Sequence, residues 1–296
     1  MIPPRKQWCI QIDVTNACPR RCANCTRLCA HAREPFTMDR ATFETAARAL
    51  AAFPTDSPPD PSGRRKLVGL IGGEPLLHPQ FPELVTILRA AVPERSHRGL
   101  WTGLDFRQHR HRDSIDRLLG PRPTVDVAPQ PRGAGGYLNQ NLHHPNTPSR
   151  HQPVLVAIQD VVRDEAAMWR LIEQCPLQRA WSASITPKGF FFCEVAGALD
   201  TIFEGPGGLP ITPGCWRHDL ADYRQQIERW CPRCGICLPL VPRVDGEARD
   251  DVSASNLQAL IRLKSPRVLR GEFVEFDASR WEPPENWEPL RYRGGP

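Results

Sequence analysis

The chain has 296 residues, enough to bury a full hydrophobic core, and its net charge of +5 is modest for that length. Lysine and arginine are scattered, with no contiguous basic run longer than Arg64-Arg65-Lys66, which argues against a nucleic-acid partner. No stretch approaches the roughly 18 apolar residues of a membrane span, and residues 1–8 lack the apolar core of a signal peptide. We therefore expect a soluble, cytoplasmic protein without a membrane partner.

Strand and helix patterns alternate through the first 190 residues. Apolar and β-branched runs predict strands, and apolar residues at helical spacing predict helices. The predicted strands are 8–15, 66–71, 99–104, 124–128, 154–158 and 181–186, and the predicted helices are 39–52, 81–92, 112–119 and 164–174. Such βαβ units form parallel sheets, so we expect an α/β fold, a partial (βα)6 barrel with its active site in the loops after the strands.

The remaining segments are predicted to be loops and a smaller extension. A surface loop is expected at 54–63, and a long loop rich in Pro, Gly, Asn and His at 129–153. After residue 188 come a hairpin pattern at 189–195, a Gly/Pro-rich stretch and cysteine-bearing loops. We therefore expect a barrel over 1–188, a small C-terminal cluster-binding extension over 189–245, and a C-terminal helix and tail over 246–296.

The eleven cysteines are odd in number and bunched, which indicates metal binding in a reducing compartment. The loop after the first strand reads Cys18-Pro-Arg-Arg-Cys22-Ala-Asn-Cys25. Three thiolates can hold an iron–sulfur cluster and leave one of four irons open to a chelating ligand. A structural zinc ion takes four ligands; Cys29 or His31 could supply the fourth, so zinc stays an alternative.

The spacing CxxxCxxC after the first strand is similar to the signature of the radical S-adenosylmethionine (SAM) superfamily. Gly72-Gly73-Glu74-Pro75, after the second strand, resembles that superfamily's Gly-Gly-Glu-Pro motif, and the resemblance covers residues 8–190. It implies that the three cysteines hold a 4Fe-4S cluster whose open iron chelates SAM, and that residues 72–75 contact the amino group of SAM. Reductive cleavage would then give a 5′-deoxyadenosyl radical that abstracts hydrogen from a substrate. Asn24 stands where the family often has an aromatic residue near the adenine, and it is the one adenine contact that we assign.

A second group of cysteines lies downstream: Cys193, Cys215, Cys231, Cys234 and Cys237. Their order resembles the SPASM and shorter "twitch" extensions of radical SAM enzymes, which bind auxiliary clusters. The resemblance implies one auxiliary 4Fe-4S cluster held by four of the five, and a zinc knuckle is the alternative. Cys9 and Cys175 are predicted to be small buried hydrophobes. Cys29 is either a plain exposed thiol or a hydrogen donor to the substrate radical.

Polar side chains in the loops that follow the strands are candidate substrate ligands. They are Asp105, Arg107, His109, Gln130, Arg132, His143, His144 and Asp160. In a barrel they would line one mouth and suit a small molecule rich in hydroxyl or amino groups. The alternative is that these loops are simply solvated. The loop over 129–153 is long enough to be a lid.

The sequence thus predicts a radical SAM oxidoreductase, a dehydrogenase or epimerase acting on a sugar, cyclitol or similar metabolite. An external electron donor such as flavodoxin or ferredoxin is implied by the resemblance. A peptide-modifying radical SAM enzyme is the second hypothesis, weakened because the cysteine motif begins at residue 18. A zinc-binding interaction module is the third, and it needs zinc at both cysteine groups.

Overall fold

The fold is described by a computed structural model covering residues 1–60, 63–105, 107, 109–120, 124–126 (backbone only), 135–141, 149–177 and 181–282. A seven-stranded sheet forms its centre, in the order β4-β5-β3-β2-β1-β7-β8. All pairs are parallel except β7 with β8, which form a hairpin. The strands are β1 (Cys9–Asp13), β2 (Leu67–Ile71), β3 (Arg98–Thr102), β4 (Thr124–Asp126), β5 (Tyr137–Gln140), β7 (Ser182–Thr186) and β8 (Gly189–Phe191).

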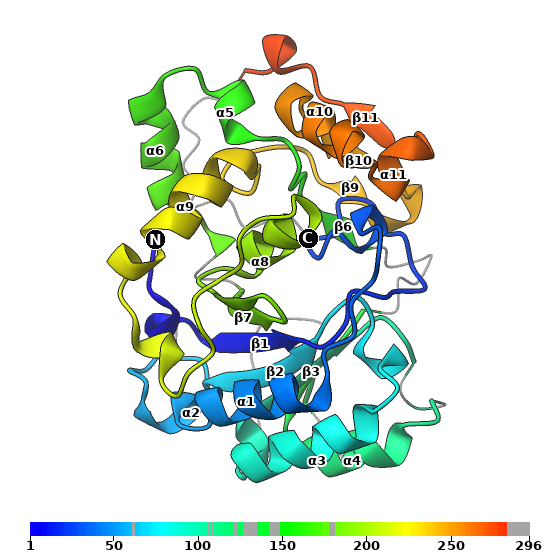
Figure 1. The fold of residues 1–296 in the computed structure, drawn as a ribbon, viewed down its shortest axis with the longest axis vertical. Helices are drawn as coiled ribbons and strands as arrows, with labels where there is room; N and C mark the ends of the chain where they lie inside the picture. Colours follow the sequence, from blue (N-terminus) through cyan, green and yellow to red (C-terminus); the bar gives the residue numbers. More distant parts are fainter. Residues whose placement is uncertain are drawn as a thin grey trace.

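Two layers of helices enclose this sheet, as Figure 1 shows. One face is covered by α1 (Arg40–Leu50), α2 (Phe53–Asp56), α3 (Phe81–Ala91) and α4 (Arg112–Leu119). On the other side lie α5 (Ile158–Val161), α6 (Glu165–Glu173), α8 (Glu194–Ile202), α9 (Arg224–Trp230), α10 (Ala254–Arg262) and α11 (Pro266–Leu269). Two small sheets complete the molecule: antiparallel β6 (Arg150–His151) with β9 (Arg243–Val244), and parallel β10 (Asp250–Val252) with β11 (Phe273–Glu275).

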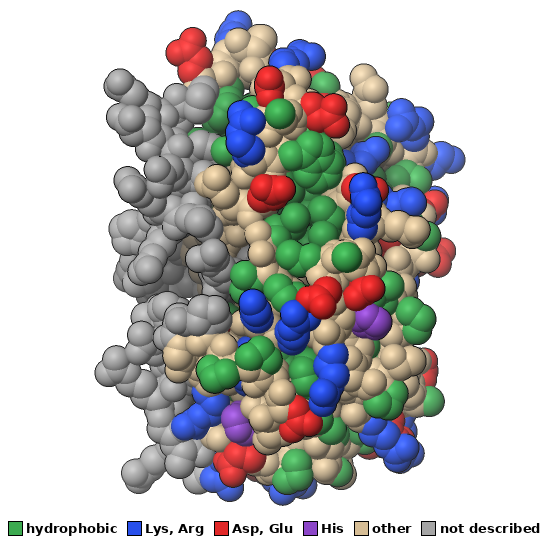
Figure 2. Space-filling model, turned by 90° about the vertical axis from the view of Figure 1, so that its left-hand side faces the viewer, with side chains coloured by type: hydrophobic (Ala, Val, Ile, Leu, Met, Phe, Trp, Pro, Cys, Tyr) green, Lys and Arg blue, Asp and Glu red, His purple; other side chains and the backbone are tan. Residues whose placement is uncertain are grey.

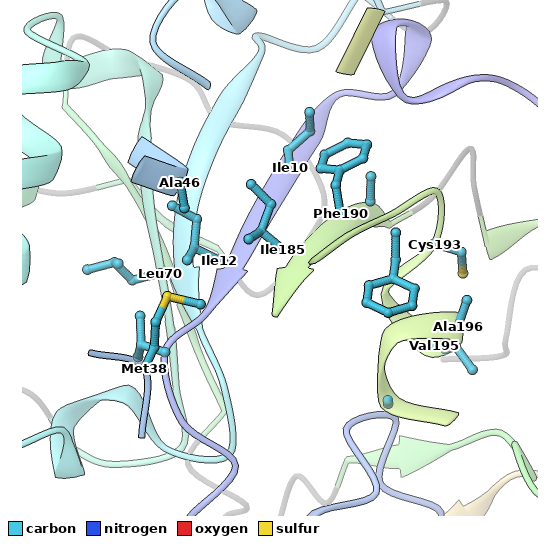
Figure 3. Close-up of a cluster of buried hydrophobic side chains, with 14 of the residues drawn as sticks. Ile10, Ile12, Met38, Ala46, Leu70, Ile185, Phe190, Cys193, Val195 and Ala196 are labelled. Carbon is cyan, nitrogen blue, oxygen red and sulfur yellow. The ribbon is translucent and has the colours of Figure 1, made fainter. Parts of the chain in front are cut away.

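The central strand β1 has apolar side chains on one face of the sheet and polar side chains on the other. Ile10 and Ile12 are fully buried in the core shared with α1 and α3, and Figure 3 shows Ile12 and Leu70 beside Met38 and Ala46. Burying each such side chain contributes roughly 1.5–3 kcal/mol. Gln11 and Asp13 point the opposite way because side chains alternate along a strand. The polar side chains at the carboxyl end of the sheet therefore lie on the face away from α1 and α3.

An aromatic cluster closes the amino end of this second face. Trp8, Trp101 and Tyr137 pack together, with ring centroids 5.1 to 6.2 Å apart. Trp101 fits only because Gly69 lacks a side chain: a Cβ there would lie 2.1 Å from its ring. The open part of the face is thus confined to the carboxyl ends of β1, β2 and β7.

The structure corrects three of the predicted elements and confirms most others. The segment 154–158 is not a strand but a buried turn leading into α5, because its apolar residues pack under residues 235–253. The predicted loop 129–153 contains β5, inserted between β3 and β4, and β6. The loop predicted at 54–63 begins inside α2, where Phe53 and Pro54 are buried.

The predicted barrel is therefore observed as a mixed α/β fold with a mostly parallel, open-ordered sheet. Among the described residues β4 and β8 end the sheet and do not pair with each other. The predicted boundary at residue 188 falls in the turn between β7 and β8. Within the described residues, none of the helices has the length and apolar character needed to cross a bilayer.

Candidate functional site

The two motifs of the first half meet at the carboxyl ends of β1 and β2. The Gly73 N–H donates to Thr15 O at 2.7 Å, and the Glu74 N–H donates to Ala17 O at 2.9 Å. A Cβ on Gly72 would lie 2.1 Å from Thr15 O, and one on Gly73 would lie 2.5 Å from Ala17 O. Both glycines are therefore required for the cysteine loop to lie directly against residues 72–74.

Glu74 is buried at this junction, and its carboxylate is already hydrogen-bonded by protein. Oε1 accepts from Leu76 N at 3.0 Å and from Thr102 Oγ1 at 2.8 Å, while Oε2 accepts from Gly103 N at 2.8 Å. Burial raises the pKa of this carboxyl, opposed by the hydrogen bonds from Leu76 and Thr102. The carboxylate joins the ends of β2 and β3, and Pro75 follows it as the first residue of a short 3-10 helix, Pro75–Leu77.

The three thiols of the first loop are half-buried and close enough to influence one another. Burial raises the pKa of Cys18 to about 11 and that of Cys22 to about 12, and the Cys25 sulfur contributes to both increases. The Cys29 thiol donates to the Cys25 sulfur, which lowers the pKa of Cys25 and raises that of Cys29. Cys29 therefore lies beside Cys25 as a hydrogen-bond partner.

Asn24 occupies the tight turn between Cys22 and Cys25, with a left-handed φ of 48°. Its side chain is buried and pairs with Asp251: Nδ2 donates to Asp251 Oδ2 at 2.9 Å, and Oδ1 accepts from Asp251 N at 2.9 Å. The side chain predicted to contact adenine is thus engaged with β10. Figure 1 shows this loop beside β6, β9 and β10.

A buried ion-pair network lies behind the first cysteine loop. Arg27 Nη1 is 3.2 Å from Asp13 Oδ2, and Arg27 Nη2 is 2.9 Å from Glu194 Oε2, with all three side chains at most 7% exposed. Gln11 accepts from Arg27 and, at 2.8 Å, from the Ser182 hydroxyl, which also bonds Glu194. Burial raises the pKa of Asp13 to about 6, and the Arg27 charge opposes that increase. The Arg27–Glu194 ion pair links the loop that follows Cys25 to the start of α8, next to Cys193.

The network borders a small pocket lined by residues 72–73 and by α8. Three buried polar atoms near it have no hydrogen-bond partner among the described residues: Asp13 Oδ1, Arg27 Nε and Ser184 Oγ. Buried polar atoms without partners are costly, and a ligand or water with hydroxyl or amino groups would satisfy them. This face can therefore accept a polar small molecule next to the Gly72–Gly73 segment.

The second cysteine group forms a pocket lined by apolar side chains and five cysteines. These are Cys175, Cys193, Cys231, Cys234 and Cys237. Figure 2 shows apolar side chains gathered on the face where α6 and α9 lie at the left of Figure 1. Figure 3 shows Cys193 beside Ala196 and Val195, on the far side of Phe190 from Ile10 and Ile185. Burial raises the pKa of Cys193 well above its usual value, and the neighbouring Cys175 sulfur adds to that increase.

This pocket differs in two members from the predicted ligand set. Cys215 does not line it; it is buried elsewhere, with its carbonyl accepting from the Tyr223 hydroxyl at 3.1 Å. Cys175, predicted to be a structural hydrophobe, takes its place because α6 ends beside Cys193 and Cys231. The order of the downstream cysteines could not reveal this, since Cys175 precedes the hairpin.

Both cysteine groups offer thiol donors, which iron–sulfur clusters require. In the described part of the chain, no three His, Cys, Asp or Glu side chains are grouped tightly enough for a single metal ion. Cys18, Cys22 and Cys25 would hold a four-iron cluster with one iron open if Cys29 stays outside the ligand set as the hydrogen-bond partner of Cys25, whereas the second pocket offers thiols enough for all four irons.

The predicted substrate ligands are only partly placed by the structure. Asp105 and Arg107 are exposed, with Asp105 Oδ1 accepting from Arg107 N at 3.0 Å, and His109 packs against His111. Asp160 accepts from Ser255 N at 2.9 Å, which joins α5 to α10. Gln130, Arg132, His143 and His144 lie outside the described residues.

The polar side chains that the structure does bring together are Asp13, Arg27 and Glu194, and the prediction overlooked them. The signal was present in residues 10–15, where Gln11, Asp13 and Thr15 alternate with Ile10, Ile12 and Val14. That period of two indicates a strand with one polar buried face. Glu194 carried no comparable signal because it begins a helix.

Comparisons with known proteins leave the family open. No family model matches the chain, and no curated protein matches it. Among solved structures, a similar one is BtrN in complex with AdoMet and 2-DOIA, at 16% sequence identity and a TM-score of 0.46. That alignment covers 77% of this chain and 92% of the other. A likeness of this degree fixes neither fold nor activity, which rest on the residues and geometry above.

Proposed function

We propose that this chain is a radical SAM enzyme that oxidises a polar small molecule. The observation that carries the proposal is the direct backbone contact between the CxxxCxxC loop and the Gly72–Glu74 segment. Two motifs about fifty residues apart in sequence thereby form one surface at the carboxyl end of the sheet. In parallel sheets this edge is where loops assemble ligand sites.

In this proposal Cys18, Cys22 and Cys25 hold the SAM-binding 4Fe-4S cluster. With cluster and SAM bound, one electron from the cluster would cleave the sulfonium bond and supply a 5′-deoxyadenosyl radical that abstracts hydrogen. Glycines 72 and 73 leave room for the loop, and their backbone faces the cavity where the SAM amino group would bind. Glu74 supports this segment from behind through its bonds to Thr102 and Gly103.

The substrate is a small polar molecule such as a sugar or cyclitol. The unpartnered oxygen of Asp13 and the unpartnered Arg27 Nε, both behind the cysteine loop, favour a ligand that offers hydroxyl or amino groups. Buried carboxylate and guanidinium groups bind such partners well because their hydrogen bonds are charge-assisted. They also raise the cost of an apolar substrate, which would leave them unpaired.

Cys175, whose sulfur raises the pKa of each of the other four thiols in the second pocket, and three of those four hold an auxiliary 4Fe-4S cluster. An oxidation requires that the substrate radical lose one electron and one proton after hydrogen abstraction, and a cluster here would accept the electron. Residues of α8 line both this pocket and the polar pocket beside Asp13, and Glu194 at the start of α8 pairs with Arg27. SAM would then be consumed stoichiometrically, and an external flavodoxin or ferredoxin would reduce the first cluster.

Oxidation is favoured over epimerisation by the position of Cys29. An epimerase needs a thiol that returns a hydrogen atom to the substrate radical. The Cys29 thiol instead bonds the Cys25 sulfur, and Cys29 does not line the cavity beside Asp13. Under this proposal, Cys29→Ala leaves product formation in place, and the product is two electrons more oxidised than the substrate rather than an epimer that carries deuterium from solvent.

The test combines iron content with SAM cleavage in anaerobically reconstituted protein. Wild type should be brown, carry about seven or eight irons per chain by ligand arithmetic, and release 5′-deoxyadenosine when reduced. The Cys18→Ala/Cys22→Ala/Cys25→Ala variant should retain the iron of the second site. It should release no 5′-deoxyadenosine. Release of 5′-deoxyadenosine by that variant, or colourless wild-type protein that carries zinc, would overturn the proposal.

A matched pair of serine variants tests the second site. Cys175→Ser should lower the iron content by about half and stop product formation while SAM cleavage persists, because a four-iron cluster needs its thiolates. Cys215→Ser, which changes a cysteine outside the pocket, should keep wild-type iron. Loss of iron in Cys215→Ser with wild-type iron in Cys175→Ser would contradict this assignment and favour the ligand set predicted from sequence, which includes Cys215 and not Cys175.

A further inference from the structure

The loop that carries the first three cysteines is held from the C-terminal part of the chain. Ala23 N donates to Asp245 O at 2.8 Å, and Asn24 N donates to Asp250 Oδ1. Asp250 belongs to β10, and it precedes the Asp251 that pairs with the Asn24 side chain. Contacts more than 200 residues apart in sequence therefore fix the turn between Cys22 and Cys25.

Arg267, in α11, contacts the backbone of that loop at Cys22. Its Nη1 donates to Cys22 O at 3.0 Å and its Nη2 donates to Arg21 O at 3.2 Å. The third nitrogen, Nε, is 3.1 Å from Asp250 Oδ2, and both side chains are at most 1% exposed. A planar guanidinium can hold two successive carbonyls and a carboxylate at once, which the single ammonium of lysine cannot.

Asp250 is the hub of this arrangement, which we call the C-terminal clamp (Asp250, Asp251 and Arg267). In addition to Asn24 N and Arg267, it contacts His31 Nε2 at 2.7 Å, and His31 Nδ1 bonds Ser265 Oγ at 2.8 Å. Buried charged groups are retained only when they are paired and hydrogen-bonded, as here. The clamp thus holds both ends of the segment from Arg21 to His31.

The backbone inside the clamp is in a conformation that needs such support. Asn24 has a φ of 48° and Leu28 a φ of 52°, both in the left-handed region that residues other than glycine rarely adopt. Such residues persist where surrounding contacts over-determine them. Without the contacts from Asp250 and Arg267, the Cys22 and Cys25 thiols would lose their fixed relative direction.

We propose that Arg267, oriented by Asp250, is a positioning residue for the SAM-binding cluster and tunes its reduction potential. This inference rests on the proposed function. The guanidinium is fully buried and is bonded to the carbonyl of one proposed cluster ligand, and charge acts more strongly in a buried site than in solvent. A positive charge favours the reduced cluster, and the paired Asp250 carboxylate opposes it, since local charge and hydrogen bonding set such potentials.

Variants of opposite charge test the electrostatic part. In reconstituted protein, Arg267→Gln should lower the midpoint potential of the cluster whose EPR signal responds to SAM, and Asp250→Asn should raise it. Arg262→Gln, the same charge change at an exposed residue of α10, is the control and should leave the potential unchanged. Equal potentials in Arg267→Gln, Asp250→Asn and wild type would overturn the proposal.

Amide hydrogen exchange in metal-free protein tests the positioning part without any cofactor. Arg267→Gln should speed exchange in peptides covering residues 21–25 at least tenfold, whereas exchange in β1 stays as in wild type. Arg267→Lys should increase the exchange rate similarly, because lysine keeps the charge but lacks the planar guanidinium that donates to two carbonyls at once. Unchanged exchange at 21–25 in Arg267→Gln would contradict the clamp, whereas absence of any cluster in wild type would contradict only the proposed function.

Discussion

Glu74 offers a test that separates support of the site from contact with SAM. Its carboxylate receives three hydrogen bonds, two at Oε1 and one at Oε2. In Glu74→Gln, the amide oxygen can keep the two bonds from Leu76 and Thr102, but the amide nitrogen then faces the Gly103 N–H, and two donors repel. Loss of a bond to a buried charged acceptor, with its donor left unsatisfied, costs about 1.5–3 kcal/mol.

We therefore expect Glu74→Gln to lower the free energy of unfolding by about 2 kcal/mol, measured by urea denaturation followed by circular dichroism. Thr102→Val, which removes one of the three donors, should cost about 1 kcal/mol. Glu83→Gln, on the exposed face of α3, should stay within about 0.5 kcal/mol of wild type. Unchanged stability of Glu74→Gln together with weaker SAM binding would refute this reasoning and favour a direct contact of the carboxylate with SAM.

Three further outcomes are expected from the sheet and its first helix. Because burial raises the pKa of Asp13 to about 6, its contribution to stability is present below pH 4 and is lost as pH rises through 6. The difference in unfolding free energy between wild type and Asp13→Asn should fall over that window in urea titrations, and a flat difference would contradict the raised pKa. Gly69→Ala should cost roughly 1–3 kcal/mol and shift tryptophan fluorescence, because its Cβ would overlap the Trp101 ring. Asp39→Ala should lower stability by about 1 kcal/mol in thermal melts through loss of the N-cap of α1, and an unchanged melting temperature would show that the cap is dispensable.

Periodicity and caps predicted the elements that rest on local signals. The helix starting after Asp39 and the strands β1, β2 and β7 lie within two residues of their predicted bounds, since apolar alternation and capping residues mark them. The segment 154–158 was mistaken for a strand because a short apolar run reads the same in a strand and in a buried turn. Its burial under residues 235–253 depends on partners about eighty residues downstream, which no local pattern contains.

The candidate site could likewise be predicted only in part. The cysteine loop and residues 72–75 could be assigned to one site because both follow strands that become neighbours in the sheet. Two roles could not be predicted from the sequence: that of Glu74 as a link to β3, and that of Asn24 as a partner of Asp251. Both depend on side-chain partners that only the complete fold brings together. Cys175 joins the second pocket for the same reason.

The distance along the chain between the cysteine loop and its clamp has a consequence for protein synthesis. Asn24 and Asp250 are separated by 226 residues. At typical translation rates of about 5–20 residues per second, Asp250 is added roughly 10–45 s after Asn24. During that interval the contacts from Asp250 and Arg267 that hold the turn between Cys22 and Cys25 cannot form. A chain interrupted before Asp250 would therefore lack the support that fixes this turn.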